Sequence, residues 1–172
     1  MPKKKGDTKA VKIAAVLVIA LVLGGVVYFL MQNSAGAAAK VGDCIQVTKV
    51  SPAEIANVDC KSADAMYKVG ISKDDLKAGC PSPAYIAYTE TGGSTDVLLC
   101  LVLVAEKDQC FKADGQVFVK VDCAKGAEFK VVKVVDKSDD PTKCGAKGGL
   151  PPFTYPEPKL TICRAPIAAT PS

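Results

Sequence analysis

The residues with the clearest chemical potential in this sequence are its cysteines. The 172 residues contain eight cysteines and no histidine. Without an imidazole, a Ser-His-Asp triad, a Cys-His pair, an H-E-x-x-H zinc site and a histidine-ligated haem are all excluded. No C-x-x-C is present, which also excludes thioredoxin-type redox chemistry and zinc-knuckle spacing. An even number of cysteines in a small region predicts structural disulfides, with a thiol redox function as a weaker alternative. The cysteines are Cys44, Cys60, Cys80, Cys100, Cys110, Cys123, Cys144 and Cys163.

The cysteine spacing repeats along the chain. Superimposing the first four cysteines on the second four gives offsets of 66, 63, 64 and 63 residues. The second cysteine of each set ends the phrase Val-Asp-Cys, which is followed by AMYKV at 65–69 and by AEFKV at 127–131. An acidic pair precedes the third cysteine of each set. Four cysteines in order and a shared local phrase indicate an internal duplication, with units at 41–105 and 106–164.

Short stretches rich in β-branched and aromatic residues predict five strands in each unit. The predicted strands are 43–48, 55–59, 66–72, 84–90 and 96–104, then 110–112, 116–121, 128–135, 153–155 and 159–163. Asp114-Gly115 predicts a hairpin turn, and Ser72 predicts a capped single turn of helix over 72–77. The expected fold class is therefore mainly β, as two tandem small disulfide-stapled β units behind an N-terminal transmembrane helix.

Each unit of about 60 residues is too small to be comfortably stable on apolar burial alone, which explains two disulfides apiece. Pairing within units leaves three connectivities per unit and nine together. We favour local pairing because each local pair brackets a hairpin-like excursion. This hypothesis joins Cys44–Cys60, Cys80–Cys100, Cys110–Cys123 and Cys144–Cys163.

The N-terminal region predicts the compartment. Residues 1–12 carry five lysines and one aspartate, and residues 13–31 follow without a single charge. A 19-residue helix is about 28 Å long, close to the ~30 Å hydrocarbon core of a bilayer. The basic flank orients it with the N-terminus in the cytoplasm and the C-terminal region outside the plasma membrane. Cleavage as a signal peptide after Ala35-Gly36-Ala37 is the alternative.

The remaining segments carry little chemistry. Residues 32–40 read as a tether and 165–172 as a disordered tail. Basic and acidic residues balance beyond residue 12, which argues against nucleic-acid binding. The cluster at 136–140 lacks a calcium-loop pattern, and 145–149 lacks the spacing of a phosphate-binding loop. We expect no metal, cofactor or catalytic constellation. The aromatic residues near proline-rich segments form a candidate binding surface: Tyr85, Tyr88, Phe153 and Tyr155.

The basic tail and apolar span, the Gly-Asp-Cys at 42–44 and the two cysteine-to-strand phrases resemble the LppU-type family of small actinobacterial envelope proteins. The region 41–163 is also similar to septum-formation-type extracytoplasmic domains. Those domains place a histidine shortly after the second cysteine. This chain has Ser-Ala-Asp at 62–64 and Lys-Gly-Ala at 125–127 instead, so no role of that histidine carries over. The resemblance implies an envelope location and no established activity. The disulfides, the duplication, the predicted membrane span and the lack of a catalytic motif favour a non-enzymatic module that binds an envelope protein or wall component. The alternative function is an atypical Ser-Lys hydrolase.

Overall fold

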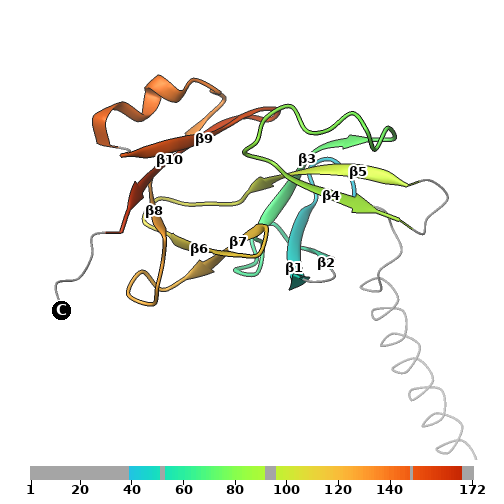
Figure 1. Cartoon of the computed structure of the whole chain (residues 1–172), viewed down its shortest axis with the longest axis horizontal. Coiled ribbons are helices and arrows are strands. Elements are labelled where there is room, and N and C mark those ends of the chain that lie inside the picture. The colour runs from blue at the N-terminus through green and yellow to red at the C-terminus, as the bar shows by residue number, and fades with distance from the viewer. Residues whose placement is uncertain (1–38, 51–52, 92–95, 148, 168–172) are drawn as a thin grey trace, which may run out of the picture. The chain divides into compact units, whose positions relative to one another are not determined.

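The computed structural model describes residues 39–50, 53–91, 96–147 and 149–167 (Figure 1). The predicted membrane span at 13–31, most of the tether and most of the C-terminal tail lie outside these ranges. No helix within the described ranges has the length and apolar character needed to cross a bilayer.

The described residues form ten β-strands and one 3-10 helix, η1 (Pro141–Lys147). All ten predicted strands are present, with ends shifted by a few residues, which confirms the mainly β fold. The first five strands are β1 (Cys44–Val50), β2 (Ala53–Val58), β3 (Tyr67–Lys73), β4 (Ile86–Glu90) and β5 (Val97–Leu103). The second five are β6 (Cys110–Asp114), β7 (Val117–Val121), β8 (Phe129–Asp136), β9 (Leu150–Pro156) and β10 (Lys159–Pro166).

The strands form two antiparallel sheets with the same order. Sheet A runs β2-β1-β3-β5-β4, and sheet B runs β7-β6-β8-β10-β9. Each strand of sheet A therefore has a counterpart five places later in sheet B (Figure 1). We call the residues of β1–β5 and their loops repeat 1, and those of β6–β10 repeat 2. The shared topology agrees with the duplication that the cysteine spacing predicts.

The loops around the first cysteine of each repeat also match in detail. The Gly42 N–H donates to the Val69 carbonyl in repeat 1, and the Asp108 N–H donates to the Val131 carbonyl in repeat 2, each over 2.8 Å. Gly42 (φ 98°) and its counterpart Asp108 (φ 72°) both have positive φ. Glycine and aspartate are among the residues that tolerate this region, so both repeats keep the same turn with different side chains.

All eight cysteines are paired, and the favoured local connectivity is confirmed. In each repeat one bridge closes the first hairpin, and the other ties the loop before the fourth strand to the fifth strand. The pairs are Cys44–Cys60, Cys80–Cys100, Cys110–Cys123 and Cys144–Cys163.

A β-bulge interrupts the alternation of side chains along β8. Simple alternation places Phe129, Val131 and Val135 on one face, which Lys133 interrupts. The register with β10 shifts between Val131 and Lys133, so Lys133 lies opposite Cys163 and is exposed. Val134, rather than Val135, then packs against the core. The extra residue of a bulge reverses the alternation, and this explains the apparent interruption.

The predicted helical turn at 72–77 is wrong. Ser72 continues β3, where it pairs with Leu99 of β5. A turn follows, in which the Lys77 N–H donates to the Asp75 carboxylate over 2.9 Å. Sheet pairing therefore outweighs the local capping signal. In repeat 2 the corresponding loop does contain a helix, η1, which begins at Pro141. The carboxylate of Asp140, just before the helix, accepts a hydrogen bond from the Thr142 N–H over 2.9 Å.

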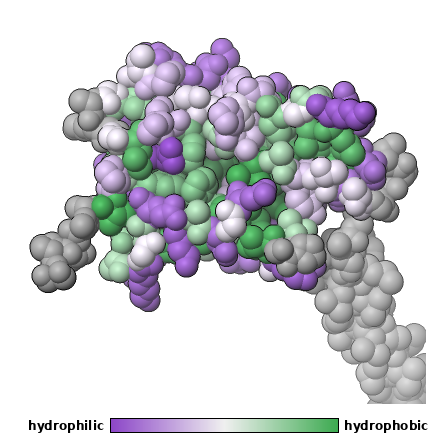
Figure 2. Space-filling view, viewed as in Figure 1, coloured by the Kyte–Doolittle hydropathy of each residue, from purple (hydrophilic) through white to green (hydrophobic). Residues whose placement is uncertain are grey.

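The two sheets share one hydrophobic core, built from buried residues of both repeats. Every residue of β5 is buried, because its two faces are covered by different parts of the molecule. One face belongs to the core shared with repeat 2, and the other carries the Cys80–Cys100 bridge. Figure 2 shows hydrophobic residues reaching the surface near the middle of one side, bordered by hydrophilic residues.

Candidate functional site

The candidate site depends on how the two repeats meet, and tyrosine hydroxyls make several of these contacts. Tyr67 of β3 is 1% exposed. Its hydroxyl donates to the Phe118 carbonyl over 3.0 Å and accepts from the Phe118 N–H over 2.6 Å. Phe118 lies on β7, an edge strand of sheet B. A side chain of repeat 1 therefore satisfies backbone groups that an edge strand would otherwise leave unpaired. Burial raises the pKa of Tyr67 to about 12.

A second tyrosine makes the equivalent contact at the turn between β9 and β10. The Tyr85 hydroxyl donates to the Glu157 carbonyl over 2.6 Å and accepts from the Glu157 N–H over 3.1 Å. The same turn lies against Gly70 of β3, where an added Cβ would come within 2.8 Å of the Glu157 carbonyl oxygen. Any larger residue at position 70 would push the turn of repeat 2 away from repeat 1.

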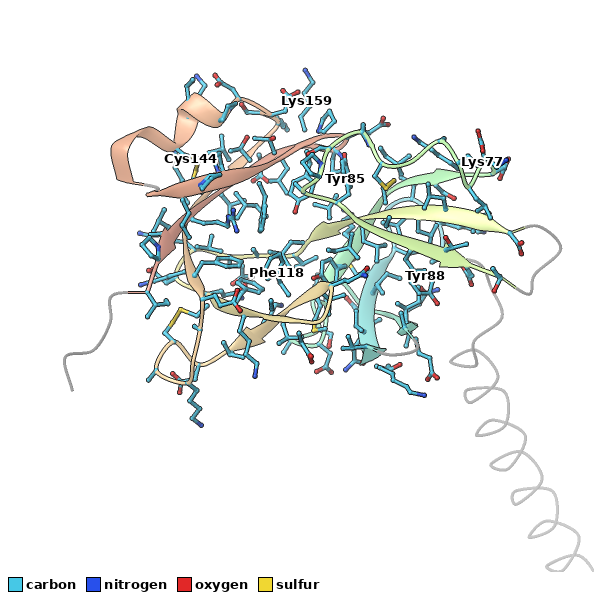
Figure 3. All side chains as sticks on the ribbon, viewed as in Figure 1. Lys77, Tyr85, Tyr88, Phe118, Cys144 and Lys159 are labelled. Atoms are coloured by element: carbon cyan, nitrogen blue, oxygen red, sulfur yellow. A yellow bond between two sulfur atoms is a disulfide. The ribbon has the colours of Figure 1, made fainter. Side chains whose placement is uncertain are left out.

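The four aromatic residues predicted as a binding surface do not form one surface. Tyr85 and Tyr155 are 6% and 0% exposed and meet edge to face at 5.0 Å between ring centroids. Both are core residues of the contact between repeats, so this part of the prediction is wrong. Phe153 and Tyr88 are half-buried, and they occupy corresponding places in the two repeats. Figure 3 shows Tyr85 near the β9–β10 end and Tyr88 on β4.

In repeat 2, aromatic rings and a guanidinium fill the inner side of sheet B. The Arg164 Cζ lies 3.6 Å from the centroid of the Phe153 ring and 5.0 Å from that of Phe129. Phe118 meets Phe129 and Phe153 at 5.2 and 5.4 Å between centroids. The Arg164 Nε also donates to the Pro151 carbonyl over 3.0 Å, which holds the side chain in place. We call Phe118, Phe129, Phe153 and Arg164 the aromatic corner.

The corresponding place in repeat 1 is an open groove of about 390 Å³. This volume lies within the ~300–1,000 Å³ of typical ligand pockets. The groove is lined mainly by aliphatic side chains, with the Tyr88 ring on one side and the β6–β7 turn on another. Its lining residues are Val47, Val50, Ala53, Ile55, Ile86, Ala87, Tyr88, Leu101, Gly115, Gln116 and Val117.

Register establishes which groove residues correspond to the aromatic corner. Ile55 pairs with the third residue after the first cysteine of repeat 1, as Phe118 does in repeat 2. Tyr88 lies opposite the residue before the fourth cysteine, as Phe153 does. Leu101 follows Cys100 directly, as Arg164 follows Cys163. Smaller or neutral side chains at Ile55 and Leu101 leave the space that Phe118 and Arg164 fill in repeat 2.

The groove lies in a field of negative charge. Glu54, next to Ile55 on β2, and Asp114, next to Gly115, are exposed carboxylates. Glu90 lies two residues beyond Tyr88 on β4. Among the described residues, Lys49 is the one lysine next in sequence to a lining residue, and its ammonium pairs with the Glu54 carboxylate at 3.2 Å. Burial raises the pKa of Tyr88, and the carboxylates of Glu90 and Glu54 raise it further.

Sequence reasoning identified Tyr88 but missed the other groove residues. Ile55 and Leu101 look like ordinary strand residues when each is considered in its own repeat. A signal was present, because aligning the repeats on their cysteines places Leu101 against Arg164. A substitution of an aliphatic for a cationic residue on matched inner faces marks a place where two copies have diverged.

The hydrolase alternative requires a lysine desolvated beside a serine. Burial lowers the pKa of Lys120, which gives it one of the two features. Its ammonium donates to the Ala65 carbonyl over 2.7 Å, and the nearby Ser62 hydroxyl donates to Asp64. In the part of the chain that the structure describes, hydrogen bonding pairs no serine hydroxyl with a lysine. Lys120 therefore acts as a further link between the repeats.

Comparison of this chain with protein-family models, curated proteins and solved structures finds no match. The assignment of the site therefore depends on the geometry of the groove and on the difference between the two repeats.

Proposed function

We propose that this protein is a non-enzymatic binding module of the cell envelope, held at the outer side of the plasma membrane by residues 13–31. Its binding site is the groove of repeat 1, and its partner is an envelope protein or wall component. One observation carries the proposal: repeat 1 leaves open, between aliphatic side chains, the place that repeat 2 fills with its aromatic corner.

The scaffold supports this function. Four disulfides and a shared core hold the groove walls in place, so that binding does not have to order them first. Disulfides persist in oxidising compartments, which supports an extracytoplasmic location for residues 39–167. The uncharged span at 13–31 and the resemblance to small actinobacterial envelope proteins support membrane attachment.

Site-specific photo-crosslinking in intact membranes tests the binding site. A photoreactive benzoylphenylalanine replaces Gln116, which lines the groove, or Lys77, which is exposed on the loop after β3. We expect a discrete adduct from position 116 and none of the same mass from position 77. Adding Ile55→Phe, which copies Phe118 into the groove, is expected to remove the adduct.

Thr89→Phe is the matched control, because it adds an aromatic side chain at an exposed position of β4 outside the groove lining. The adduct is expected to survive this change. An adduct that persists in Ile55→Phe, or that forms equally from positions 77 and 116, would contradict a binding role for the groove.

N-terminal sequencing of the membrane-extracted protein tests the anchor. We expect the span at 13–31 to be retained, so that the sequence begins at Met1 or Pro2. A start at Ala38 would show cleavage after Ala37 and a secreted protein instead.

A further inference from the structure

The aromatic corner of repeat 2 shows which chemical group complements this site. Arg164 places its guanidinium over the Phe153 ring at 3.6 Å. In repeat 1 the ring is present as Tyr88, but Leu101 stands where the arginine would be. Among residues 39–50, 53–91, 96–147 and 149–167, Arg164 makes the only cation–π contacts, so none of these residues supplies a cation to Tyr88.

The charge around the groove favours the same group. The carboxylates of Glu54 and Glu90 both raise the pKa of Tyr88, and Asp114 comes directly before Gly115 of the lining. Among the residues that the structure describes, Lys49 is the one lysine or arginine next in sequence to a lining residue. Lys49 is already paired with Glu54. A positively charged group placed over the Tyr88 ring would therefore meet both the ring quadrupole and a net negative field.

The position of the groove favours an extended chain. Its lining includes residues of β2 and of β4, which are the two edge strands of sheet A. Edge strands present backbone N–H and C=O groups that an added segment can pair with. The aliphatic side chains of Val47, Val50 and Ile55 provide the apolar surface for alternate side chains of such a segment.

We propose that the groove binds an extended segment of a partner protein that carries an arginine between aliphatic residues, with the guanidinium over the Tyr88 ring. This inference rests on the proposed binding function of the groove, and it names the chemistry of the occupant.

Two peptides that differ only in charge test the proposal on the full-length chain in detergent micelles. The first is fluorescein-labelled Gly-Val-Arg-Val-Gly-amide, and the second has citrulline, a neutral planar isostere, in place of arginine. We expect the arginine peptide to bind about tenfold more tightly, measured by fluorescence anisotropy. Tyr88→Leu is expected to abolish this preference, and Glu90→Gln to reduce it while keeping the acceptor for the Ala39 N–H.

Blocking the groove tests whether the peptides bind there, independently of whether arginine is preferred over citrulline. Ile55→Phe is expected to weaken both peptides, and Thr89→Phe to weaken neither; circular dichroism verifies that each variant is folded. Equal affinity for the two peptides would overturn the arginine inference and leave the groove as a binding site. Unchanged peptide binding in folded Ile55→Phe would overturn both proposals.

Discussion

Repeat 1 and repeat 2 have the same strand order, the same disulfide pattern and matching turns before their first strands, but they fill their inner sides differently. Repeat 2 places the rings of Phe118, Phe129 and Phe153 together around Arg164. Repeat 1 has aliphatic residues at two of the corresponding positions and keeps a groove. The two copies therefore retain one scaffold and have diverged where side chains of the inner faces meet.

One pair of corresponding positions differs between the repeats by a hydroxyl group that contacts the other repeat. Tyr67 and Phe129 are counterparts, each opposite the second residue of the first strand in its sheet. The hydroxyl that distinguishes them binds Phe118 on the other repeat. A hydroxyl present in only one copy therefore adds a specific polar link to the hydrophobic core that the two repeats share.

The largest expected effect on stability comes from comparing a substitution in the aromatic corner of repeat 2 with one in the groove of repeat 1. Phe129 is 1% exposed and contacts three other rings as well as Arg164. Phe129→Ala is expected to lower the free energy of unfolding by about 3–5 kcal/mol, measured by urea denaturation, because it leaves a buried cavity. Tyr88→Ala, on the half-buried side of the groove, is expected to cost less. A larger loss for Tyr88→Ala would break the comparison between a filled and an open site.

Removal of corresponding disulfides tests whether the scaffolds are equivalent. The Cys80–Cys100 and Cys144–Cys163 bridges span 20 and 19 residues, and Cys100 and Cys163 are both fully buried. The double alanine variants are each expected to lose about 3 kcal/mol of unfolding free energy, on the chain-entropy account. Thermal and urea denaturation would measure both losses. A difference of more than about 2 kcal/mol would show that the repeats use these bridges differently.

The smallest expected effect on stability comes from a substitution that places a residue type of repeat 2 at the corresponding position of repeat 1. Tyr67→Phe introduces the residue type found at position 129 and removes the hydroxyl from the Phe118 N–H and C=O. The expected loss is about 1–2 kcal/mol at neutral pH, because backbone groups lose their partner. Tyr88→Phe is the matched control and is expected to change stability by less than about 0.5 kcal/mol.

The stability difference between the native chain and Tyr67→Phe is expected to depend on pH. Burial raises the pKa of Tyr67 from 10.0 to about 12, so the folded state favours the neutral hydroxyl. Its contribution is therefore complete below pH 10 and is lost as the pH rises from 10 towards 12. We expect the stability difference between the native chain and Tyr67→Phe to be constant below pH 10 and to shrink above it. A difference that grows with pH would contradict the assigned burial of this hydroxyl.

Local pattern predicted a large part of the fold. The repeated cysteine spacing and the AMYKV and AEFKV phrases located two equivalent units, and stretches rich in β-branched and aromatic residues located all ten strands. The hairpin at Asp114-Gly115 also formed, with Gly115 at φ 61°. These features depend on residues close together in the chain, for which steric and turn preferences are strong. The helical turn at 72–77 failed because pairing of Ser72 with β5 competes with a weak local cap.

The sequence alone determined the internal duplication, the strand content and the absence of imidazole chemistry, because each follows from residue type and near-neighbour spacing. It favoured the local disulfide pairing among nine connectivities, and the structure confirmed that pairing. Only the tertiary structure decided that Tyr85 and Tyr155 are core residues, that the bulge in β8 turns Lys133 outward, and that repeat 1 keeps a groove where repeat 2 does not. The bulge depends on pairing between β8 and β10, and the burial of Tyr85 and Tyr155 depends on contacts between the two repeats, such as that of Tyr85 with Glu157, 72 residues away. The free energy of such contacts depends on the shape of both partners, which neither segment specifies by itself.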